Sequence, residues 1–389
     1  MLRRFHAIAF KTLQDVTIDL GSINVFVGAN GSGKSNILEA LGILGAAASG
    51  RVSDESLIYR GVRPGLPALY KSSFRGTQGA QHIRLEADSV DAHYMVSLWN
   101  PIDAPSMDWK YKHEKLVAEK KNIVSRSPAS SGNLNDSAGL AALKAVEMLP
   151  DNPAGEILNI LKNYAIYCPD TPTLRGLEPD MQSREPVGLA GGRLPEGLQS
   201  MLYGEQRKLI VEMLSVVDWL SKVGVVYSKE LPISASVPQL QRGLRFTDKF
   251  MVEGRNILSG YDASEGVLYL LYYAVLALHP SSPKLFAIDN FDQALNPRVA
   301  RDFTRRFCRF ILEDGGRQVL LTTHNPLVLD GLPLQDDRVR LFAVDRSKQG
   351  KTIVRRVVVD EALLAAAKKG TPLSQAWVDG HFGGVPNNV

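Results

Sequence analysis

A glycine-rich pattern at residues 28–35 constrains this chain more than any other feature. The residues Gly-Ala-Asn-Gly-Ser-Gly-Lys-Ser fit G-x-x-x-x-G-K-[S/T], with Gly28, Gly33, Lys34 and Ser35 at the defining positions. The apolar run at 23–27 before it is typical of a buried strand, and the apolar spacing after it is typical of a helix. A strand, a glycine loop and a helix in this order predict an α/β P-loop fold with a phosphate-binding site.

The same residues predict a site for ATP and Mg²⁺. Backbone N–H groups of a glycine loop converge on phosphate oxygens, and the positive end of the following helix adds to the attraction. We expect Lys34 to reach the β- and γ-phosphates and Ser35 to ligate Mg²⁺. The other residues expected to bind the nucleotide are Gly28, Asn30, Gly31, Ser32, Gly33 and Asn36.

Two later strand ends complete the expected site. Residues 285–288 are apolar and lead into Asp289, which would reach the metal beside Ser35. Such a run also occurs by chance as a turn at a strand end, and its place before Asn296-Pro297 favours the metal site. Residues 319–323 predict a second buried strand that ends before His324, which can contact the γ-phosphate or orient water. A lone histidine is more often an ordinary surface or core group, but its Thr-Thr-His-Asn-Pro context favours a functional role.

Ser264 and Gly266 stand before a predicted helix at 267–278. This pattern is either a second phosphate cradle at a helix N-terminus or an ordinary N-cap, with Ser264 capping and Glu265 in the first turn. The pattern alone does not distinguish the two.

The order of predicted elements divides the chain into three parts. Residues 1–104 form one half of a nucleotide-binding domain, with strands at 4–10 and 16–20 and a hairpin over 82–99. Residues 241–389 form the other half and end in strands near 339–344 and 352–359.

The middle part, residues 105–240, is expected to be a mostly helical insertion. Helical spacing is found at 140–148, 154–163 and 206–223, and the charged run 114–121 is typical of an exposed helix. The polar stretch 125–138 and the Pro/Gly-rich stretch 169–197 predict surface loops.

Composition excludes few classes but agrees with a globular, cytoplasmic protein. The 389 residues are 44% hydrophobic and 22% charged. No apolar run reaches the ~20 residues that span a bilayer, so we expect no membrane association. Cys168 and Cys308, the only cysteines, are expected to be reduced core residues. The net charge of +4 permits nucleic-acid binding without arguing for it.

Together these motifs resemble the ABC-type ATPase head, in the branch that contains SMC, RecF and OLD proteins. The resemblance rests on residues 30–41, 264–271 and 322–329, and it covers about 1–100 and 240–345. It implies a mixed sheet flanked by helices, an antiparallel β-subdomain and a helical insertion. It also implies a homodimer or higher even oligomer, in which Ser264 and Gly266 of one chain close on the nucleotide held by the other.

The chain is also similar to stand-alone AAA-family ATPases of anti-phage defence, of the Septu and OLD-like kind. Only about 65 residues follow His324, which leaves no room for the Toprim nuclease of OLD proteins. The resemblance therefore implies a separately encoded effector, a nuclease or toxin, as partner. A RecF-like DNA-repair or DNA-loading ATPase is one alternative, and a nucleotide-gated interaction module with very slow hydrolysis is another.

One position departs from the family pattern. The family places Glu, the general base, directly after the metal-binding Asp, whereas this chain has Asn290. An amide cannot accept a proton at neutral pH, so we expect slow hydrolysis and a long-lived ATP-bound dimer. Two alternatives remain: Asp292 substitutes as the base, or His324 positions water alone. The expected catalytic set is Lys34, Asp289, Asn290, Asp292 and His324.

A row of arginines is the remaining candidate. Arg298, Arg301, Arg305 and Arg309 share one face of a predicted helix. The row could contact nucleic acid or an acidic partner, but a solvated helix face is the default interpretation.

Overall fold

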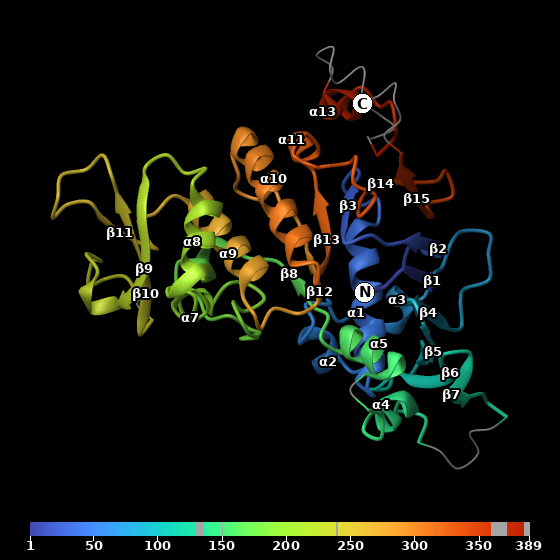
Figure 1. The fold of residues 1–389 in the computed structure, drawn as a ribbon. Helices are drawn as coiled ribbons and strands as arrows, with labels where there is room; N and C mark the ends of the chain where they lie inside the picture. The colour runs from blue at the N-terminus through green and yellow to red at the C-terminus, as the bar shows by residue number, and fades with distance from the viewer. Residues whose placement is uncertain (130–134, 150, 239, 359–371, 385–389) are drawn as a thin grey trace.

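The computed structural model describes residues 1–129, 135–149, 151–238, 240–358 and 372–384. A central mixed sheet separates an antiparallel sheet on one side from a helical region and a small three-stranded sheet on the other (Figure 1). The strands of the central sheet, in spatial order, are β15 (Thr352–Val357), β14 (Val339–Arg346), β3 (Ile23–Val27), β13 (Gln318–Thr323), β12 (Leu285–Ile288) and β8 (Ile166–Tyr167). All neighbours pair in parallel except β14 and β15. The predicted α/β fold class is therefore confirmed.

Alternating side chains of the central strands divide the hydrophobic core in two. On β3, Val25 joins the cluster around α9 (Glu265–Leu278) and α10 (Pro297–Asp314), whereas Phe26 joins the cluster around α1 (Lys34–Ala48). Strands covered on both faces are expected to be apolar throughout, and every residue of β3 is buried. This double covering holds the carboxyl ends of β3, β12 and β13 at one edge of the sheet.

The antiparallel sheet packs its inner face on α1. Its strands, in spatial order, are β2 (Leu13–Asp19), β1 (Arg4–Phe10), β4 (Ile83–Asp88), β5 (Ala92–Trp99), β6 (Lys110–Ala118) and β7 (Lys121–Arg126). The predicted strand at 4–10 and the hairpin over 82–99 are confirmed, and the strand expected at 16–20 lies within β2 except for its last residue.

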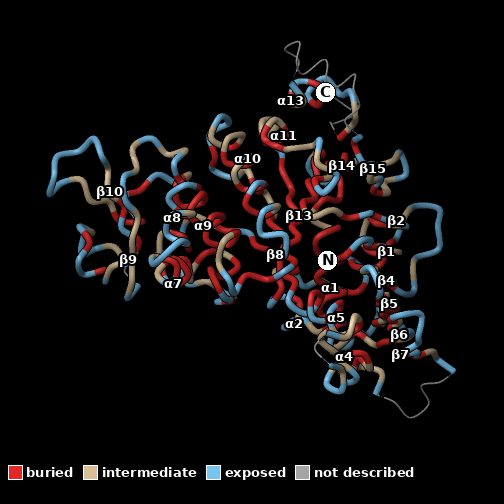
Figure 2. The backbone as a smooth tube through the Cα atoms, in the orientation of Figure 1, coloured by how far each residue is buried: buried red, intermediate tan, exposed pale blue. Residues whose placement is uncertain are grey.

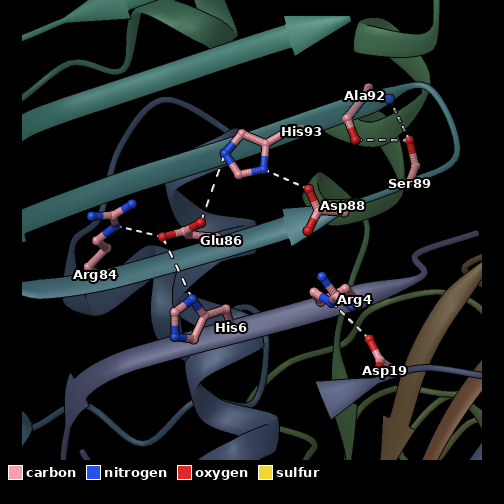
Figure 3. A network of polar contacts seen from close by, with 9 residues as sticks. All are labelled: Arg4, His6, Asp19, Arg84, Glu86, Asp88, Ser89, Ala92 and His93. Carbon is pink, nitrogen blue, oxygen red and sulfur yellow. Dashed lines mark hydrogen bonds and ion pairs between the residues drawn. The ribbon is translucent and has the colours of Figure 1, made fainter. Parts of the chain in front are cut away.

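The outer face of this sheet carries a network of charged side chains (Figure 3). Glu86 on β4 lies between His6 and His93, at 3.8 and 3.9 Å, and also pairs with Arg84 at 2.6 Å. His93 contacts Asp88 at 2.7 Å. Such cross-strand pairs stabilise a solvated sheet face, and each charge in this network has a partner within the sheet.

Short helices and a third sheet complete the fold. The helices are α2 (Asp54–Ile58), α3 (Pro67–Tyr70), α4 (Leu140–Ala145), α5 (Pro153–Lys162), α6 (Thr171–Leu174), α7 (Leu194–Ser200), α8 (Gly204–Leu214), the 3-10 helix Ser228–Glu230, α11 (Pro326–Leu329) and α13 (Leu373–Val378). The third sheet has the order β11 (Ile257–Ser259), β10 (Arg242–Asp248), β9 (Leu220–Tyr227). Burial is densest around the central sheet, whereas the loops of the third sheet are largely exposed (Figure 2).

The segment 105–240 is less helical than predicted. It contains β6, β7, β8 and β9, and β8 is part of the central sheet. The exposed helix expected over 114–121 is wrong, because β6 and β7 form a hairpin there. The alternation of buried Leu116 with exposed Lys115 has the period of a strand, and pairing with β5 provides the ladder that a charged run alone does not reveal.

Two other expectations in this segment also fail. The helix expected over 206–223 ends at Leu214, and β9 begins at Leu220. The stretch 169–197 is partly packed rather than a surface loop, since Leu194 is fully buried and Tyr272 on α9 donates to the carbonyl of Gly188. Residues 130–134 of the loop expected at 125–138, and residue 359 of the last expected strand, lie outside the described residues.

Candidate functional site

The glycine loop lies between β3 and α1, in the predicted strand–loop–helix order. Gly33 is the N-cap of α1 and has a φ of 114°, in the left-handed region that glycine tolerates best. A Cβ on Gly28 would lie 2.2 Å from the carbonyl oxygen of Val344 on β14. The loop therefore packs directly against the central sheet, and the N-terminus of α1 opens at the edge where the parallel strands end.

Lys34 is held inside the loop. Its Nζ donates to the carbonyls of Gly28 at 2.7 Å and Ala29 at 3.1 Å, and the residue is only 5% exposed. Burial lowers the pKa of Lys34 to about 8, and the nearby Asp289 and Asp292 oppose this shift. Lys34 forms no ion pair within the described part of the chain, and a buried ammonium group in this state favours an incoming anion such as phosphate.

Asp289 follows β12 and lies beside Ser35. The Oγ of Ser35 donates to Oδ2 of Asp289 at 2.9 Å, and Thr322 donates to Oδ1 of the same carboxylate. A hydroxyl and a carboxylate are hard oxygen donors of the kind that Mg²⁺ prefers. In addition, Ser32 Oγ is buried without a hydrogen-bond partner among the described residues. The donor set, the orphaned hydroxyl and the glycine cradle fit a bound triphosphate with Mg²⁺ held by Ser35 and Asp289.

The residues after Asp289 reach the end of β13. Asn290 has a φ of 55°, and its N–H donates to Thr322 Oγ1 at 2.8 Å. Asp292 Oδ1 accepts from the backbone N–H of His324 at 3.1 Å. Burial and the charge of Lys34 lower the pKa of His324, so its imidazole is neutral at pH 7. The structure thus brings the five expected catalytic residues to one edge of the central sheet.

Ser264 and Gly266 lie elsewhere, at the start of α9. Ser264 occupies the N-cap position, but its side chain makes no capping hydrogen bond and the residue is exposed. The N-cap interpretation is therefore not supported by the contacts of this serine. The carbonyl of Ala294, in the loop after β12, lies 3.1 Å from the point where a Cβ on Gly266 would be.

The remaining predicted nucleotide-binding residues surround the loop. Asn30 and Gly31 are exposed at its tip, and Gly31 has a φ of 77°. Asn36 on α1 donates to Thr12 Oγ1 at 2.8 Å, which ties the helix to the turn between β1 and β2.

Sequence reasoning missed four side chains at this site. Thr322 bonds to both Asp289 and the N–H of Asn290, and Thr352 Oγ1 donates to the carbonyl of Ser32 at 2.8 Å. Arg63 pairs with Glu39 at 2.6 Å, and Arg346 Nη1 reaches the carbonyl of Gly31 at 3.3 Å. Thr322 could have been found from its place before His324. The other three follow no motif.

The two cysteines and the arginine row on α10 take no part in this site. Of the two cysteines, Cys308 is buried but Cys168 is exposed after β8, so the expectation of a core residue is wrong there. In the arginine row on α10, Arg301 and Arg305 pair with Asp302, and Arg309 pairs with Glu212. These carboxylates offset much of the charge that the row would offer to a nucleic acid.

A cleft of about 1000 Å³ lies at the opposite ends of β3 and β14 and is lined by Arg3, Arg338 and Arg340 among others, but it holds no loop residue. No group of three or more His, Cys, Asp or Glu side chains within the described parts of the chain could hold a metal ion. In the same parts, no helix is both long and apolar enough to cross a membrane.

Comparison with known sequences points to nucleotide-binding domains. Residues 1–94 match the family model of an AAA ATPase domain, and residues 224–330 match the model described as AAA domain, putative AbiEii toxin, Type IV TA system. A stretch of 60 residues is 42% identical to the DNA replication and repair protein RecF of Rhodococcus erythropolis (strain PR4 / NBRC 100887). That stretch spans 15% of this chain and 15% of the relative.

Comparison with solved structures shows the fold. An Smc head bound to the C-winged helix domain of ScpA superposes with a TM-score of 0.54 and 14% identity, over 93% of this chain and 99% of the other. A second similar structure is an Smc head with an extended coiled coil, bound to the C-terminal domain of ScpA derived from Pyrococcus furiosus. It superposes with a TM-score of 0.52 and 12% identity, over 95% of this chain and 99% of the other. The chain thus has the P-loop fold of an SMC head, and separate parts of it are similar to AAA ATPase domains and to RecF.

Proposed function

We propose that this protein binds ATP with Mg²⁺ at the glycine loop and hydrolyses it slowly, as a nucleotide-dependent switch. The observation that carries the proposal is the contact between Ser35 and Asp289 at 2.9 Å, at the mouth of the glycine loop. It pairs a loop hydroxyl with a strand-end carboxylate, which is the arrangement that holds Mg²⁺ in P-loop NTPases.

Each residue of the site has a distinct task in this proposal. The loop N–H groups and Lys34 bind phosphate oxygens, and Ser35 and Asp289 hold the metal. Mg²⁺, when bound, offsets the charge of the β- and γ-phosphates. The neutral imidazole of His324 orients water near the γ-phosphate, because it can donate and accept hydrogen bonds at the same time.

Two observations favour slow hydrolysis. Asn290 has no proton-accepting group, and it stands where the resemblance implies a general base. Asp292 already accepts the N–H of His324, so one of its oxygens is engaged. A missing base lowers the rate by about 10²–10⁴ if nothing replaces it, which leaves a long-lived ATP-bound state.

Two copies of the chain would complete the site. Ser264 has an exposed hydroxyl that its own helix does not use, at the N-terminus of the 14-residue helix α9. In a twofold dimer, Ser264 and Gly266 of one chain close on the triphosphate bound to Gly28–Ser35 of the other. ATP then joins the two chains, and its loss separates them.

The biological role that we propose is control of a separate effector, a nuclease or toxin, in anti-phage defence. It is supported by the matched model whose description names a putative toxin of a toxin–antitoxin system, and by similar Smc heads that are bound to a domain of another protein. A RecF-like role in DNA repair or loading is the second candidate, favoured by the 60-residue match to RecF. Tight binding to DNA gaps or ends without any effector would favour that candidate.

Light scattering after size exclusion tests the switch directly. With Mg-ATP, the wild type should dimerise, whereas Lys34→Ala and Ser264→Arg should remain monomeric. Ser281→Arg, at an exposed serine remote from the loop, is the matched control and should dimerise normally. Dimerisation of both test variants like the wild type would contradict the composite site.

Two further measurements separate the candidates. A turnover of tens per second at saturating Mg-ATP would contradict the slow switch. Plating phage on cells that carry the gene with its neighbours, as wild type or Lys34→Ala, tests the defence role. Equal protection by both would show that ATP is not needed for it.

A further inference from the structure

The three-stranded sheet at the far end from β7 concentrates positive charge (Figure 1). Residues 220–259 contain six cationic side chains and three carboxylates, a net charge of +3 in a chain whose total is +4. The cations are Lys222, Lys229, Arg242, Arg245, Lys249 and Arg255. None of them forms an ion pair or a side-chain hydrogen bond within the described residues. Charges left without partners on the surface are available to an external anion.

The outer face of this sheet is open. On β10, Leu244 and Phe246 are buried in the core, so Arg245 and Thr247 point to the opposite face. Gly224 and Lys222 pair with these two residues across the ladder and share their face. A Cβ on Gly224 would meet nothing within 4 Å. The face therefore presents the exposed side chains of Lys222 and Arg245 on either side of open space at Gly224.

Exposed rings lie beside the cations at both ends of β10. Phe250, in the turn after β10, is 75% exposed, and Lys249 Nζ lies 4.9 Å from its ring centroid. Tyr227 lies opposite Arg242 at the other end and is 48% exposed. The centroid of its ring lies 5.6 Å from Arg242 Cζ and 5.8 Å from Lys229 Nζ. Asp248 holds the turn, since its carboxylate accepts the N–H of Phe250 at 2.7 Å.

We propose that this surface binds single-stranded nucleic acid. Lys222, Arg245 and Lys249 contact the phosphates, and a base stacks on Phe250. Cations interleaved with exposed rings are what an unpaired strand requires, because its bases are free to stack whereas those of a duplex are covered. From Arg242 to Asp248 the strand extends roughly 20 Å, enough for a short run of nucleotides. The binding does not depend on the proposed ATP chemistry.

The contrast with α10 supports this choice. The arginines of α10 share their helix face with Asp302 and Glu313, and Glu212 reaches Arg309 from α8. On the three-stranded sheet, Asp248 instead bonds to the backbone. The β9–β11 surface is thus the stronger candidate for phosphate contacts.

Fluorescence anisotropy on the full chain without nucleotide tests the proposal. The probes are 20-residue oligo(dT) and oligo(rU), a 20-base-pair duplex and a poly-Glu peptide, titrated between 50 and 300 mM KCl. The test variants are Lys222→Ala/Arg245→Ala/Lys249→Ala and, separately, Phe250→Ala. Arg75→Ala/Lys162→Ala/Lys284→Ala removes the same number of exposed charges elsewhere and is the matched control. All replaced side chains are exposed, so melting temperatures should not change.

The expected results differ between the variants. The triple variant should bind either oligonucleotide at least about tenfold more weakly at 100 mM salt. The slope of the logarithm of the binding constant against log[KCl] should become less steep by about 2, because three phosphate contacts are lost and each contributes about 0.7 on a single strand. Phe250→Ala should weaken binding about fivefold or more without changing the slope, because stacking carries no charge. The control variant and Lys34→Ala should bind like the wild type.

Three outcomes would overturn the proposal. The first is a triple variant that binds like its control. The second is a duplex bound as tightly as single strands, with no effect of Phe250→Ala. The third is tight binding of the poly-Glu peptide and none of the oligonucleotides, which would mark the surface as a site for an acidic protein. A preference between oligo(dT) and oligo(rU) would support the proposal and indicate which strand is the natural ligand.

Discussion

Ser35 donates its hydroxyl hydrogen to Asp289 over 2.9 Å, although 254 positions separate the two residues in the chain. Ser35 lies in the first turn of α1, and Asp289 follows β12, two strands from β3 in the central sheet. The contact therefore forms only when the first and last thirds of the chain are folded into one sheet. It places the two expected metal ligands side by side at the mouth of the glycine loop.

Replacing Asp289 by Asn should remove the dependence of ATP binding on Mg²⁺. The amide keeps the shape of the side chain but loses the charge that holds the metal. We expect the benefit of Mg²⁺ to ATP affinity to fall at least about tenfold. Calorimetric titration with and without Mg²⁺ measures this, with Asp302→Asn on the surface of α10 as control. An unchanged Mg²⁺ effect would show that Asp289 does not hold the metal.

Replacing Asn290 by Glu should accelerate hydrolysis by about 10²-fold or more, because it supplies the missing proton acceptor. The same change should cost about 1 kcal/mol of folding free energy, since Asn tolerates the φ of 55° at this position better than Glu does. A coupled ATPase assay and urea unfolding measure the two effects. Asn290→Gln, which lengthens the side chain without a base, should not gain activity. If Asn290→Glu is no faster than Asn290→Gln, Asn290 is not at the water-activating position.

ATP affinity should fall as the pH rises through about 8, the lowered pKa of Lys34. The ammonium form attracts phosphate, and deprotonation above this pKa removes the charge, so affinity decreases by up to about tenfold per pH unit. Below pH 8 the affinity should level off. Nucleotide titrations between pH 6.5 and 9.5 measure the profile. Lys34→Arg should flatten the alkaline fall, because guanidinium stays protonated. If the ATP affinity of the wild type and of Lys34→Arg falls equally at alkaline pH, a group other than Lys34 causes the fall.

Turnover should be constant near pH 7 and should fall only below the ordinary histidine range. Burial and Lys34 lower the pKa of His324, and protonation below that pKa removes its hydrogen-bond acceptor. His324→Gln should reduce turnover by about 10²-fold and abolish the acidic fall. A pH–rate profile of both proteins distinguishes this from a structural role, which would lower the rate at every pH and keep the acidic fall.

Gly33→Ala should destabilise the fold more than Gly31→Ala. Both glycines have positive φ, so both substitutions cost about 1–2 kcal/mol in backbone strain. A Cβ on Gly33 would in addition lie 2.2 Å from Thr352 Oγ1, whereas a Cβ on Gly31 would meet nothing within 4 Å. Urea midpoints of the two variants measure the difference. Equal midpoints would mean that Thr352 moves aside at little cost.

The local signals of the chain predicted much of the site. The glycines of residues 28–33, the apolar run of β3 and the apolar residues before Asp289 each act over a few positions, so a strand end or a loop can be inferred from them. The strand–loop–helix order followed from these signals and is confirmed, as is the mixed sheet that the resemblance to the ABC-type ATPase head implied. The chemical roles of all the site residues, including Lys34, Ser35 and Asp289 as well as Ser264, Asn290 and His324, stay predictions.

The errors arose where pairing or packing with another segment decides the structure, whether that segment is a hairpin neighbour or is distant in the chain. The charged run at 114–121 has an acceptable helical pattern, and only the pairing of β6 with β5 and β7 makes it a strand. Tyr272 on α9 anchors residues 188–189, so a Pro/Gly-rich stretch became part of the core. The local secondary-structure propensity of these segments was outweighed by hydrogen bonding to, and burial against, elements that no local pattern reveals.

The sequence and the tertiary structure therefore determined different features of this protein. The sequence alone specifies a phosphate loop, a carboxylate at a strand end and the alternation of apolar side chains. The reason is that backbone conformation and the periodicity of buried side chains depend on residues close together in the chain. Three features became visible only in the folded molecule: Thr322 beside Asp289, Thr352 beside Ser32, and the cations of β9 and β10 that have no ion-pair partner among the described residues. The reason is that such contacts depend on the order and register of strands, which arise from long-range packing rather than from any single segment.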